Sequence, residues 1–159
     1  MLSVICPIYN EEKYIAGCID SIIAQNYPKD DIEVIFADGM SSDQTRKIVA
    51  QYAERYNWIR LVDNPRKIVP PALNAAVKAS RGDVIIRIDA HASYPSNYFS
   101  ALATALKRYD ADNVGAVCRT DVLVKTPKSL AIREVLAHPL GVGNSAFRTG
   151  IDSAGEVDT

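Results

Sequence analysis

The sequence predicts an α/β protein whose open, mainly parallel sheet is flanked by helices. Short apolar segments with the length of buried strands alternate along the chain with segments whose apolar residues recur at helical spacing. Such alternation indicates parallel strands joined by right-handed crossover connections. The chain has 159 residues, of which 48% are hydrophobic, and this is enough to bury the core of one domain.

The first two strands are predicted in the opening quarter of the chain. Residues 2–8 form an apolar run that is typical of a buried strand. The helix that follows has apolar residues at helical spacing, namely Ile15, Cys18, Ile19, Ile22 and Ile23. Pro28 stops this pattern, because proline cannot continue a helix. Residues 32–37 make the second strand, and Asp43 is expected to cap the helix after it.

A third strand and helix follow. Residues 58–62 form a short strand, and residues 63–67 form a polar loop. Pro70 or Pro71 suits the first turn of the next helix, because the N–H group that proline lacks has no partner inside that turn. Gly82 is predicted to end this helix.

The fourth strand is predicted over residues 84–88, and Pro95 opens a helix that buries Phe99. Residues 114–124 are expected to form a further strand, and residues 129–137 a further helix.

Two regions are predicted along the chain. Residues 1–140 form the α/β unit described above. Residues 141–159 are rich in Gly, Ser and Asp and have few large apolar side chains, so we expect a mobile loop there.

Polar residues follow each of the first four strands: Tyr9, Asn10 and Glu11, then Asp38 and Gly39, then Asp63 and Asn64, then Asp89 and His91. The carboxyl ends of parallel strands meet at one edge of a sheet, where ligands of open α/β proteins bind. We therefore expect these four loops to form the ligand site.

Asp89 and His91 lie in the string RIDAHA, directly after a buried strand. In an extended turn, two such side chains reach the same divalent cation, which would bridge the phosphates of a nucleotide sugar and stabilise the leaving diphosphate. The alternative is that Asp89 caps the next turn and His91 is an exposed or hydrogen-bonded histidine. The two interpretations have similar support from this segment alone.

Asp38 lies in the string ADGMSSDQT, where its carboxylate could accept the imino hydrogen of a pyrimidine base. Taken singly, a loop rich in turn-forming residues explains this string better. Tyr9 could stack on a base or simply pack at a strand end. Arg66 and Lys67 could pair with phosphate or be solvated. The chain contains neither GxGxxG nor GxxxxGK[ST], which weakens the dehydrogenase and P-loop alternatives.

The net charge of −1 provides no long-range attraction to nucleic acid or to anionic lipid. No apolar stretch reaches the roughly 18 residues of a membrane span, and no secretory signal follows Met1. We expect a cytoplasmic protein, which segments outside this sequence could attach to the inner face of the plasma membrane.

Three strings resemble the family 2 glycosyltransferases in order, spacing and content: PIYNEEKYIAGCIDSIIAQNYP, ADGMSSDQTRKIV and ALNAAVKASRGDVIIRIDAHASYP. The likeness covers residues 2–109. The later string HPLGVGNSAFRTG is similar to bacterial exopolysaccharide enzymes, in particular glucosyltransferases of the succinoglycan-biosynthesis type. The resemblance implies the GT-A fold, a Rossmann-like arrangement. It also implies that residues 1–140 bind a nucleotide sugar and that residues 141–159 begin the acceptor side.

Carried over by position, the resemblance implies donor-site roles for seven residues. The nucleoside and donor pocket would involve Pro7, Tyr9, Glu11, Asp38 and Asn74, and the ribose, diphosphate and metal would involve Asp89 and His91. The family usually has a second aspartate where this chain has His91. Histidine is a good ligand for Mn²⁺, whereas Mg²⁺ prefers oxygen, so this departure favours Mn²⁺ over Mg²⁺.

Inverting members of this family use a carboxylate in a later acidic motif as general base. We expect this base beyond Thr159 and assign the role to neither Glu156 nor Asp158. The leading hypothesis is a UDP-sugar-dependent transferase that acts on a polysaccharide or lipid-linked acceptor. A nucleotide-sugar-binding module without catalysis is the second hypothesis. A nucleotidyltransferase is the third, and it is weakened because PIYNEEKY lacks the glycine-rich loop typical of that class.

Overall fold

The computed structural model of the protein describes residues 1–122, 124–143, 145–150 and 154–156. The chain divides into two units, Met1–Ala103 and Thr104–Thr159. All seven residues that the sequence assigns to the donor site lie in the first unit. The boundary after residue 140, based on composition, stays a prediction.

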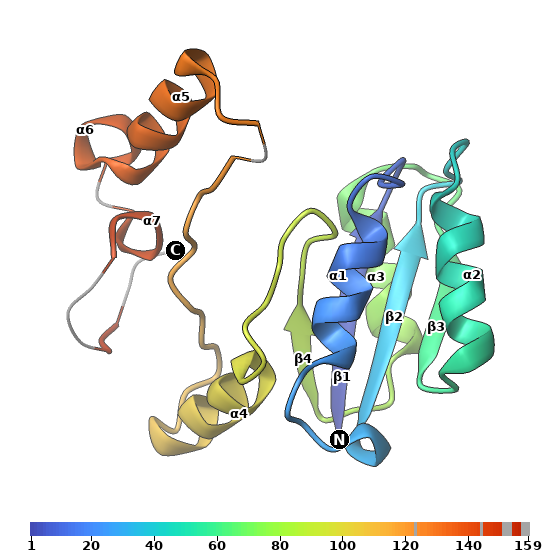
Figure 1. Cartoon of the computed structure of the whole chain (residues 1–159). Helices are drawn as coiled ribbons and strands as arrows, with labels where there is room; N and C mark the ends of the chain where they lie inside the picture. Colours follow the sequence, from blue (N-terminus) through green and yellow to red (C-terminus); the bar gives the residue numbers. More distant parts are fainter. Residues whose placement is uncertain (123, 144, 151–153, 157–159) are drawn as a thin grey trace. The chain divides into compact units, whose positions relative to one another are not determined.

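In the described part of the chain, four parallel strands form one sheet in the order β3-β2-β1-β4 (Figure 1). The strands are β1 (Leu2–Ile8), β2 (Ile32–Asp38), β3 (Ile59–Asp63) and β4 (Val84–Arg87). Ile8 pairs with Asp38, and Asp38 pairs with Asp63, so three strands end at one edge. The predicted α/β class and parallel sheet are confirmed.

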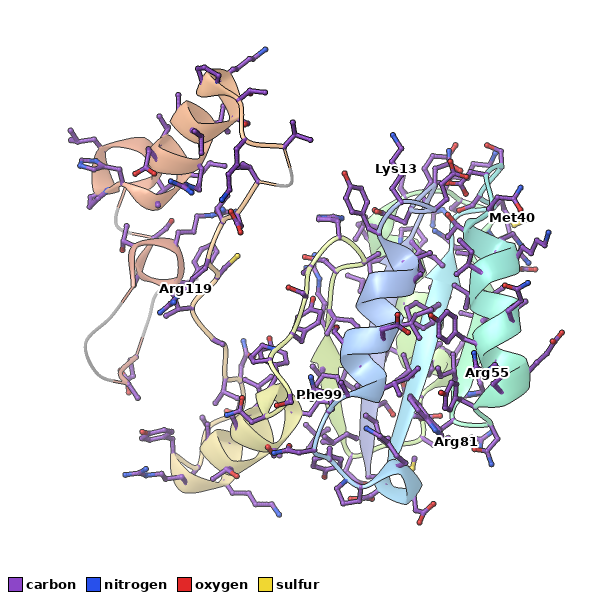
Figure 2. The ribbon with its side chains drawn as sticks, in the orientation of Figure 1. Lys13, Met40, Arg55, Arg81, Phe99 and Arg119 are labelled. Atoms are coloured by element: carbon purple, nitrogen blue, oxygen red, sulfur yellow. The ribbon has the colours of Figure 1, made fainter. Side chains whose placement is uncertain are left out.

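Helices cover both faces of this sheet (Figure 1). The helices α1 (Ile15–Ile23) and α2 (Thr45–Arg55) pack on one face with side chains such as Val4 and Phe36, while α3 (Val69–Ala79) packs on the other with Ile5 and Ile35. Because β1 and β2 are covered on both sides, their sequences are continuous apolar runs rather than alternating ones. The fully buried Phe99 joins the first core from the start of α4 (Tyr98–Arg108) (Figure 2).

Several helix ends differ from the prediction. The helix α2 begins at Thr45, and Asp43 lies one residue before its N-cap, although Asp43 Oδ1 still accepts a hydrogen bond from the Thr45 N–H at 2.9 Å. The helix α4 begins at Tyr98, three residues after Pro95. The helix α3 ends at Ala79, and Gly82 has a different role. A Cβ atom at Gly82 would lie 2.6 Å from the Met1 carbonyl oxygen, so glycine permits this close approach to β1.

A buried carboxylate connects three strands at the amino end of the sheet, where Arg81 also lies (Figure 2). Glu33 of β2 accepts hydrogen bonds from Ser3 Oγ at 2.7 Å and from the Arg60 guanidinium at 2.6 Å, and the Arg81 N–H also donates to it. Burial alone would raise the pKa of Glu33, but these hydrogen bonds outweigh burial and lower that pKa. This cluster stabilises the edge opposite the predicted ligand site.

The strand predicted over residues 114–124 is wrong: the described residues 114–122 and 124 form no strand. A strand needs a hydrogen-bonded neighbouring strand, whereas the Cys118 N–H of this segment donates to the carbonyl oxygen of Phe147, a helical residue, at 2.7 Å. Two of its described apolar side chains stay exposed, Val117 at 41% and Val124 at 70%. Apolar β-branched sequence was therefore insufficient to specify a strand.

Three further helices lie among the described residues of the second unit. The predicted helix is present as α5 (Pro127–Ala137), whose capping box joins Thr126 and Ser129. The short helices α6 (Pro139–Val142) and α7 (Ala146–Thr149) occupy part of the segment that we expected to be a loop. The expected mobility of residues 141–159 stays a prediction, and residues 144, 151–153 and 157–159, which include Asp158, lie outside the described residues. Within the described residues, no helix has the length and apolarity needed to cross a membrane.

Candidate functional site

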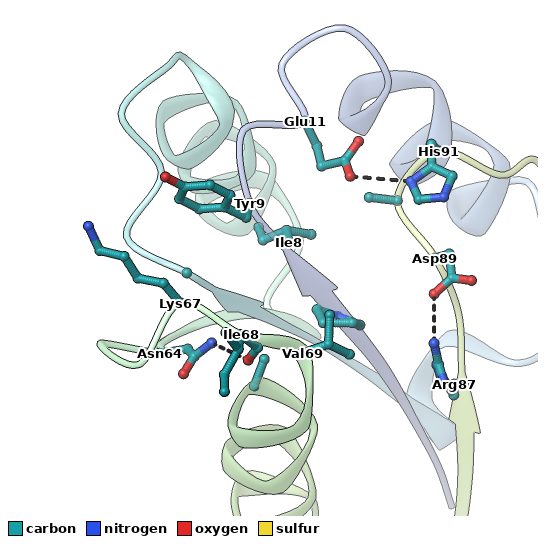
Figure 3. Close-up of a pocket in the computed structure, with 14 residues that line it drawn as sticks. Ile8, Tyr9, Glu11, Asn64, Lys67, Ile68, Val69, Arg87, Asp89 and His91 are labelled. Carbon is teal, nitrogen blue, oxygen red and sulfur yellow. Dashed lines mark hydrogen bonds and ion pairs between the residues drawn. The ribbon is translucent and has the colours of Figure 1, made fainter.

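A cavity of about 150 Å³ opens at the carboxyl ends of the strands (Figure 3). It brings together five residues that the sequence assigned to the site, namely Pro7, Tyr9, Glu11, Asp89 and His91. Asn64, Lys67 and Arg87 also line it. Cavities that enclose a whole small ligand are typically about 300–1,000 Å³. This cavity is therefore of a size to hold part of a nucleotide sugar.

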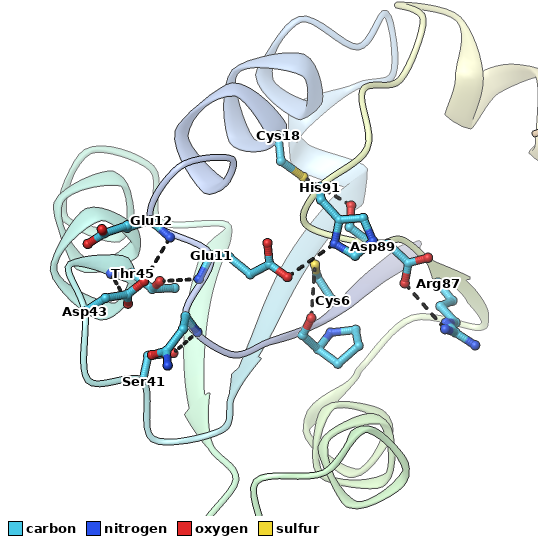
Figure 4. Close-up of polar contacts among 12 residues, drawn as sticks. Cys6, Glu11, Glu12, Cys18, Ser41, Asp43, Thr45, Arg87, Asp89 and His91 are labelled. Carbon is cyan, nitrogen blue, oxygen red and sulfur yellow. Dashed lines mark hydrogen bonds and ion pairs between the residues drawn. The ribbon is translucent and has the colours of Figure 1, made fainter. Parts of the chain in front are cut away.

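The loops after β1 and β2 are joined by hydrogen bonds (Figure 4). Two backbone N–H groups of the first loop donate to side chains of the second, Asn10 to Ser41 Oγ at 2.9 Å and Glu12 to Asp43 Oδ2 at 3.1 Å. A third, that of Glu11, donates to Oγ1 of Thr45, the first residue of α2, at 2.7 Å. Asn10 has a φ of 54°, a left-handed conformation that asparagine tolerates better than most residues. These bonds hold Tyr9 and Glu11 at the cavity.

Tyr9 lies beside Gly39 at the start of the second loop. A Cβ atom at Gly39 would lie 3.1 Å from Tyr9 Cδ2, so a larger residue there would push against the ring. The Tyr9 side chain is 48% exposed and lines the cavity. An exposed aromatic face at a strand end can stack on a base, in keeping with the role expected for Tyr9.

The backbone of Asp89 is held by the hydroxyl of Tyr94. This hydroxyl accepts a hydrogen bond from the Asp89 N–H at 2.8 Å and donates to the Asp89 carbonyl oxygen at 3.2 Å. Burial raises the pKa of Tyr94 well above its ordinary value, so the hydroxyl keeps its proton and remains a donor at neutral pH. Cys18 Sγ lies 3.8 Å from the same carbonyl oxygen.

The side chains of Asp89 and His91 point to different partners in Figure 3. His91 Nδ1 lies 3.2 Å from Glu11 Oε1, which connects the loops after β4 and β1. Asp89 Oδ1 lies 3.4 Å from Arg87 Nη2. Asp89 is 49% exposed and His91 is 62% exposed, so both are accessible to a ligand.

These residues fit a divalent cation that a diphosphate also coordinates. Within the described residues, no group of three His, Cys, Asp or Glu side chains could enclose an ion. Mg²⁺ commonly uses only one or two carboxylates, with substrate phosphates and waters as its other ligands. Asp89 and His91 can supply such a partial set, and the imidazole suits Mn²⁺ better than Mg²⁺.

Asp38 and Asn74 are not among the described residues that line the cavity. The Asp38 carboxylate is fully buried and accepts hydrogen bonds from the Ser41 N–H at 3.0 Å, the Ser41 hydroxyl and Arg46 Nη1 at 2.6 Å. Arg46 also reaches Asp63 Oδ1 at 2.8 Å. Asn74 is exposed on α3. The roles expected for Asp38 and Asn74 stay predictions.

Three further residues line the cavity: Asn64 and Lys67, from a loop that the sequence analysis expected at this edge, and Arg87, which it did not place there. Asn64 is buried, and its amide donates to the Ile68 carbonyl oxygen at 3.0 Å, which shapes the loop before α3. Lys67 in that loop has a left-handed φ of 59°. Asn64 and Lys67 belonged to a predicted strand-end loop, whereas Arg87 was placed inside a strand and was not considered.

Residues 3–153 match the family described as Glycosyl transferase family 2. The succinoglycan biosynthesis protein ExoA of Rhizobium meliloti (strain 1021) is 32% identical over 92% of this chain and 44% of its own length. The structure of S. aureus TarS 1-349 in complex with UDP-GlcNAc has a TM-score of 0.64 and 27% identity, over 77% of this chain and 37% of that one. The structure of mannosyltransferase PcManGT from Pyrobaculum calidifontis, in complex with GDP-Man and Mn²⁺, has a TM-score of 0.63 and 33% identity, over 86% of this chain and 39% of that one. The chain thus spans less than half the length of each of these relatives.

Proposed function

The chain belongs to glycosyl transferase family 2, and we propose that it is the donor-binding part of an inverting transferase for polysaccharide or cell-envelope glycan synthesis. The donor is a UDP-sugar, and the acceptor is a growing polysaccharide or a lipid-linked glycan. The single observation that carries this proposal is the cavity at the carboxyl ends of the strands. There an exposed aromatic ring, two carboxylates and an imidazole meet, from loops far apart in the sequence.

The residues of the cavity divide by chemistry into two sides. Tyr9 lies on one side in Figure 3, next to the loop of Lys67, while Asp89 and His91 lie on the other. An aromatic ring suits a nucleobase, and cation-binding side chains suit a diphosphate. We infer that the nucleoside lies against Tyr9 and that the diphosphate points toward Asp89.

A divalent metal, Mn²⁺ or Mg²⁺, would be held by Asp89 and His91 and would neutralise the charge on the departing diphosphate. The chain's own residues orient these two groups. Tyr94 fixes the backbone of Asp89, and Glu11 bonds to the ring of His91. Both arrangements reduce the freedom that the side chains would lose on binding.

Two nucleotides occur among the structural relatives, since TarS was solved with UDP-GlcNAc and PcManGT with GDP-Man. A carboxylate such as Asp38 can accept a hydrogen bond from an imino group of either base, so Asp38 alone does not discriminate. We propose uridine because a pyrimidine needs less space than a purine in a cavity of about 150 Å³.

The second candidate function is nucleotide-sugar binding without catalysis. It is favoured by the fact that the chain spans 44% or less of the relatives described above. A longer chain that turns over donor would exclude this alternative. Acceptor binding and attachment to the inner face of the plasma membrane would belong to segments outside this sequence.

A thermal-shift panel tests the proposed donor. Unfolding is followed with UDP, GDP, UDP-sugars and GDP-mannose, each with Mn²⁺ and with a chelator, because a ligand that binds only the folded state raises the melting temperature. We expect the largest rise with UDP compounds and Mn²⁺. The variants Asp89→Asn and His91→Ala should each reduce the part of the rise in melting temperature that depends on Mn²⁺. If both variants keep that part in full, these residues do not hold the metal. If only GDP compounds raise the melting temperature, the uridine assignment is wrong.

A further inference from the structure

Arg87 is a cation in the cavity that the proposed metal site does not use. It is the last residue of β4, an edge strand, where it pairs in register with Ile5 of β1. Its side chain is 57% exposed and lines the cavity beside Asp89 (Figure 3). The exposed position leaves most of its five N–H donors accessible to a ligand.

The ion pair between Arg87 and Asp89 is long and exposed. Its closest atoms are 3.4 Å apart, and the two side chains are 57% and 49% exposed. Pairs of this kind contribute little to stability, because water screens them and two long side chains must be ordered. Arg87 can therefore change partner easily when an anion enters the cavity.

The helix amino terminus at the cavity offers a diphosphate few donors. The helix α3 begins at the cavity with Val69, but the next two residues are Pro70 and Pro71, which have no N–H group. The Ala72 N–H already donates to the Ile68 carbonyl oxygen at 3.3 Å. The usual anion-binding N–H groups of a helix amino terminus are thus largely missing here.

The charged side chains of the cavity lining also indicate Arg87. Arg87 and Asp89 form an ion pair within the cavity lining, with their closest atoms 3.4 Å apart, so the guanidinium already lies beside a proposed metal ligand. A guanidinium can bond to a carboxylate and a phosphate together through its planar fork. Lys67 is the other cationic residue of the cavity lining, but it lies on the Tyr9 side in Figure 3.

We propose that Arg87 binds the diphosphate of the nucleotide donor directly, and that it supports donor binding even without the divalent metal. This inference rests on the proposed donor-binding function and adds a specific phosphate contact to it. Before the nucleotide arrives, Arg87 neutralises Asp89. When the nucleotide is bound, Arg87 shares its donors between Asp89 and the phosphate oxygens, and Asp89 becomes available to the metal.

The test is calorimetry of this 159-residue chain with UDP and with uridine, in chelator and in Mn²⁺. In chelator, Arg87→Ala should weaken UDP binding by roughly 10- to 100-fold, the size expected for hydrogen bonds to a charged group, and should leave uridine binding unchanged. In chelator, the UDP affinity of Arg87→Lys should lie between those of wild type and Arg87→Ala, because lysine keeps the charge and lacks the planar fork of N–H donors. The matched control is Arg133→Ala, which removes an arginine paired with Glu134 at 2.7 Å outside the cavity and should leave both affinities unchanged.

Asp89→Asn separates this role from that of the metal. In chelator, Asp89→Asn should not weaken UDP binding, because the variant removes a carboxylate that competes with the phosphate for Arg87. In Mn²⁺, the same variant should weaken UDP binding, because the proposed metal site loses a ligand. Equal UDP affinities of wild type and Arg87→Ala in chelator, or equal losses for UDP and uridine, would overturn the inference. If wild type binds UDP only with Mn²⁺, the inference about Arg87 is wrong and the proposed donor function stands. If UDP binds under neither condition, both the inference and the proposed function are wrong.

Discussion

At the scale of single residues, charged groups near the end of the sheet that carries the cavity are held by specific partners. Asp38 has no exposed surface, and its partners are Ser41 and Arg46. Arg46 in turn reaches Asp63 at the end of β3. A buried carboxylate without such partners would cost several kcal/mol, so this network compensates for the burial of Asp38 at the end of a buried strand.

Asp38→Ala should weaken UDP binding by about 1–3 kcal/mol if the carboxylate accepts the imino hydrogen of the base. It should also lower the melting temperature, because Arg46 loses its buried partner. Calorimetry at a temperature where both proteins are folded measures the affinity. The control is Asp63→Ala, which removes the exposed partner of the same arginine, since Asp63 is 58% exposed. Equal UDP affinity in wild type and Asp38→Ala would remove Asp38 from the site.

At the scale of elements, the loops that follow the strands are tied to one another. The loops after β1 and β2 exchange hydrogen bonds, including one from the Ser42 N–H to Asn10 Oδ1 at 2.9 Å. The loop after β4 is held through Tyr94, whose ring also packs against Tyr98 at the start of α4 with centroids 4.9 Å apart. The position of Asp89 therefore depends on the packing of α4 as well as on β4.

Tyr94→Phe should weaken Mn²⁺-dependent UDP binding by roughly threefold to tenfold, because the backbone of Asp89 loses a hydrogen-bond partner and its side chain becomes less ordered. Calorimetry with UDP and Mn²⁺ measures this. Tyr27→Phe is the control, since it removes a hydroxyl that donates to Asp31 at 3.2 Å, just before β2 at the opposite edge of the sheet. A weakening of the same size in both variants would show a general loss of stability instead of a specific effect on Asp89.

At the scale of the whole molecule, the proposed chemistry needs more than the donor cavity. The donor cavity is formed by residues 7–91, all in the first unit. Transfer also requires an acceptor hydroxyl in line with the leaving group and a base to deprotonate it. The relatives described above are more than twice the length of the matched region, which leaves room for both.

We predict that this chain binds a UDP-sugar but does not transfer the sugar. The reason is the general base, which the family resemblance places outside residues 1–159 and which alone contributes typically ~10²–10⁴-fold to the rate. The measurement compares UDP release by this chain with that of a longer chain that extends past the later acidic motif, both with a glycan acceptor present. If the short chain reaches the rate of the long one, a base lies within these residues, and Glu156 or Asp158 would be the first to examine.

The sequence by itself determined the strands and helices of the first unit, because each one buries a run or stripe of apolar side chains and this burial leaves a local pattern. It also placed Tyr9, Glu11, Asp89 and His91 at one site, since parallel strands bring their carboxyl ends to the same edge. The same local pattern failed for residues 114–124, because strand formation depends on a neighbour that lies elsewhere in the chain.

Only the tertiary structure decided which charged groups meet. Arg87 looked like an interior residue of a strand, and its place in the cavity follows from where β4 ends at the sheet edge. Asp38 looked accessible, yet Arg46 from the first turn of α2 covers its carboxylate. Hydrogen bonds and ion pairs act over a few ångströms, so they depend on how packed elements orient their side chains, and spacing along the chain does not encode that orientation.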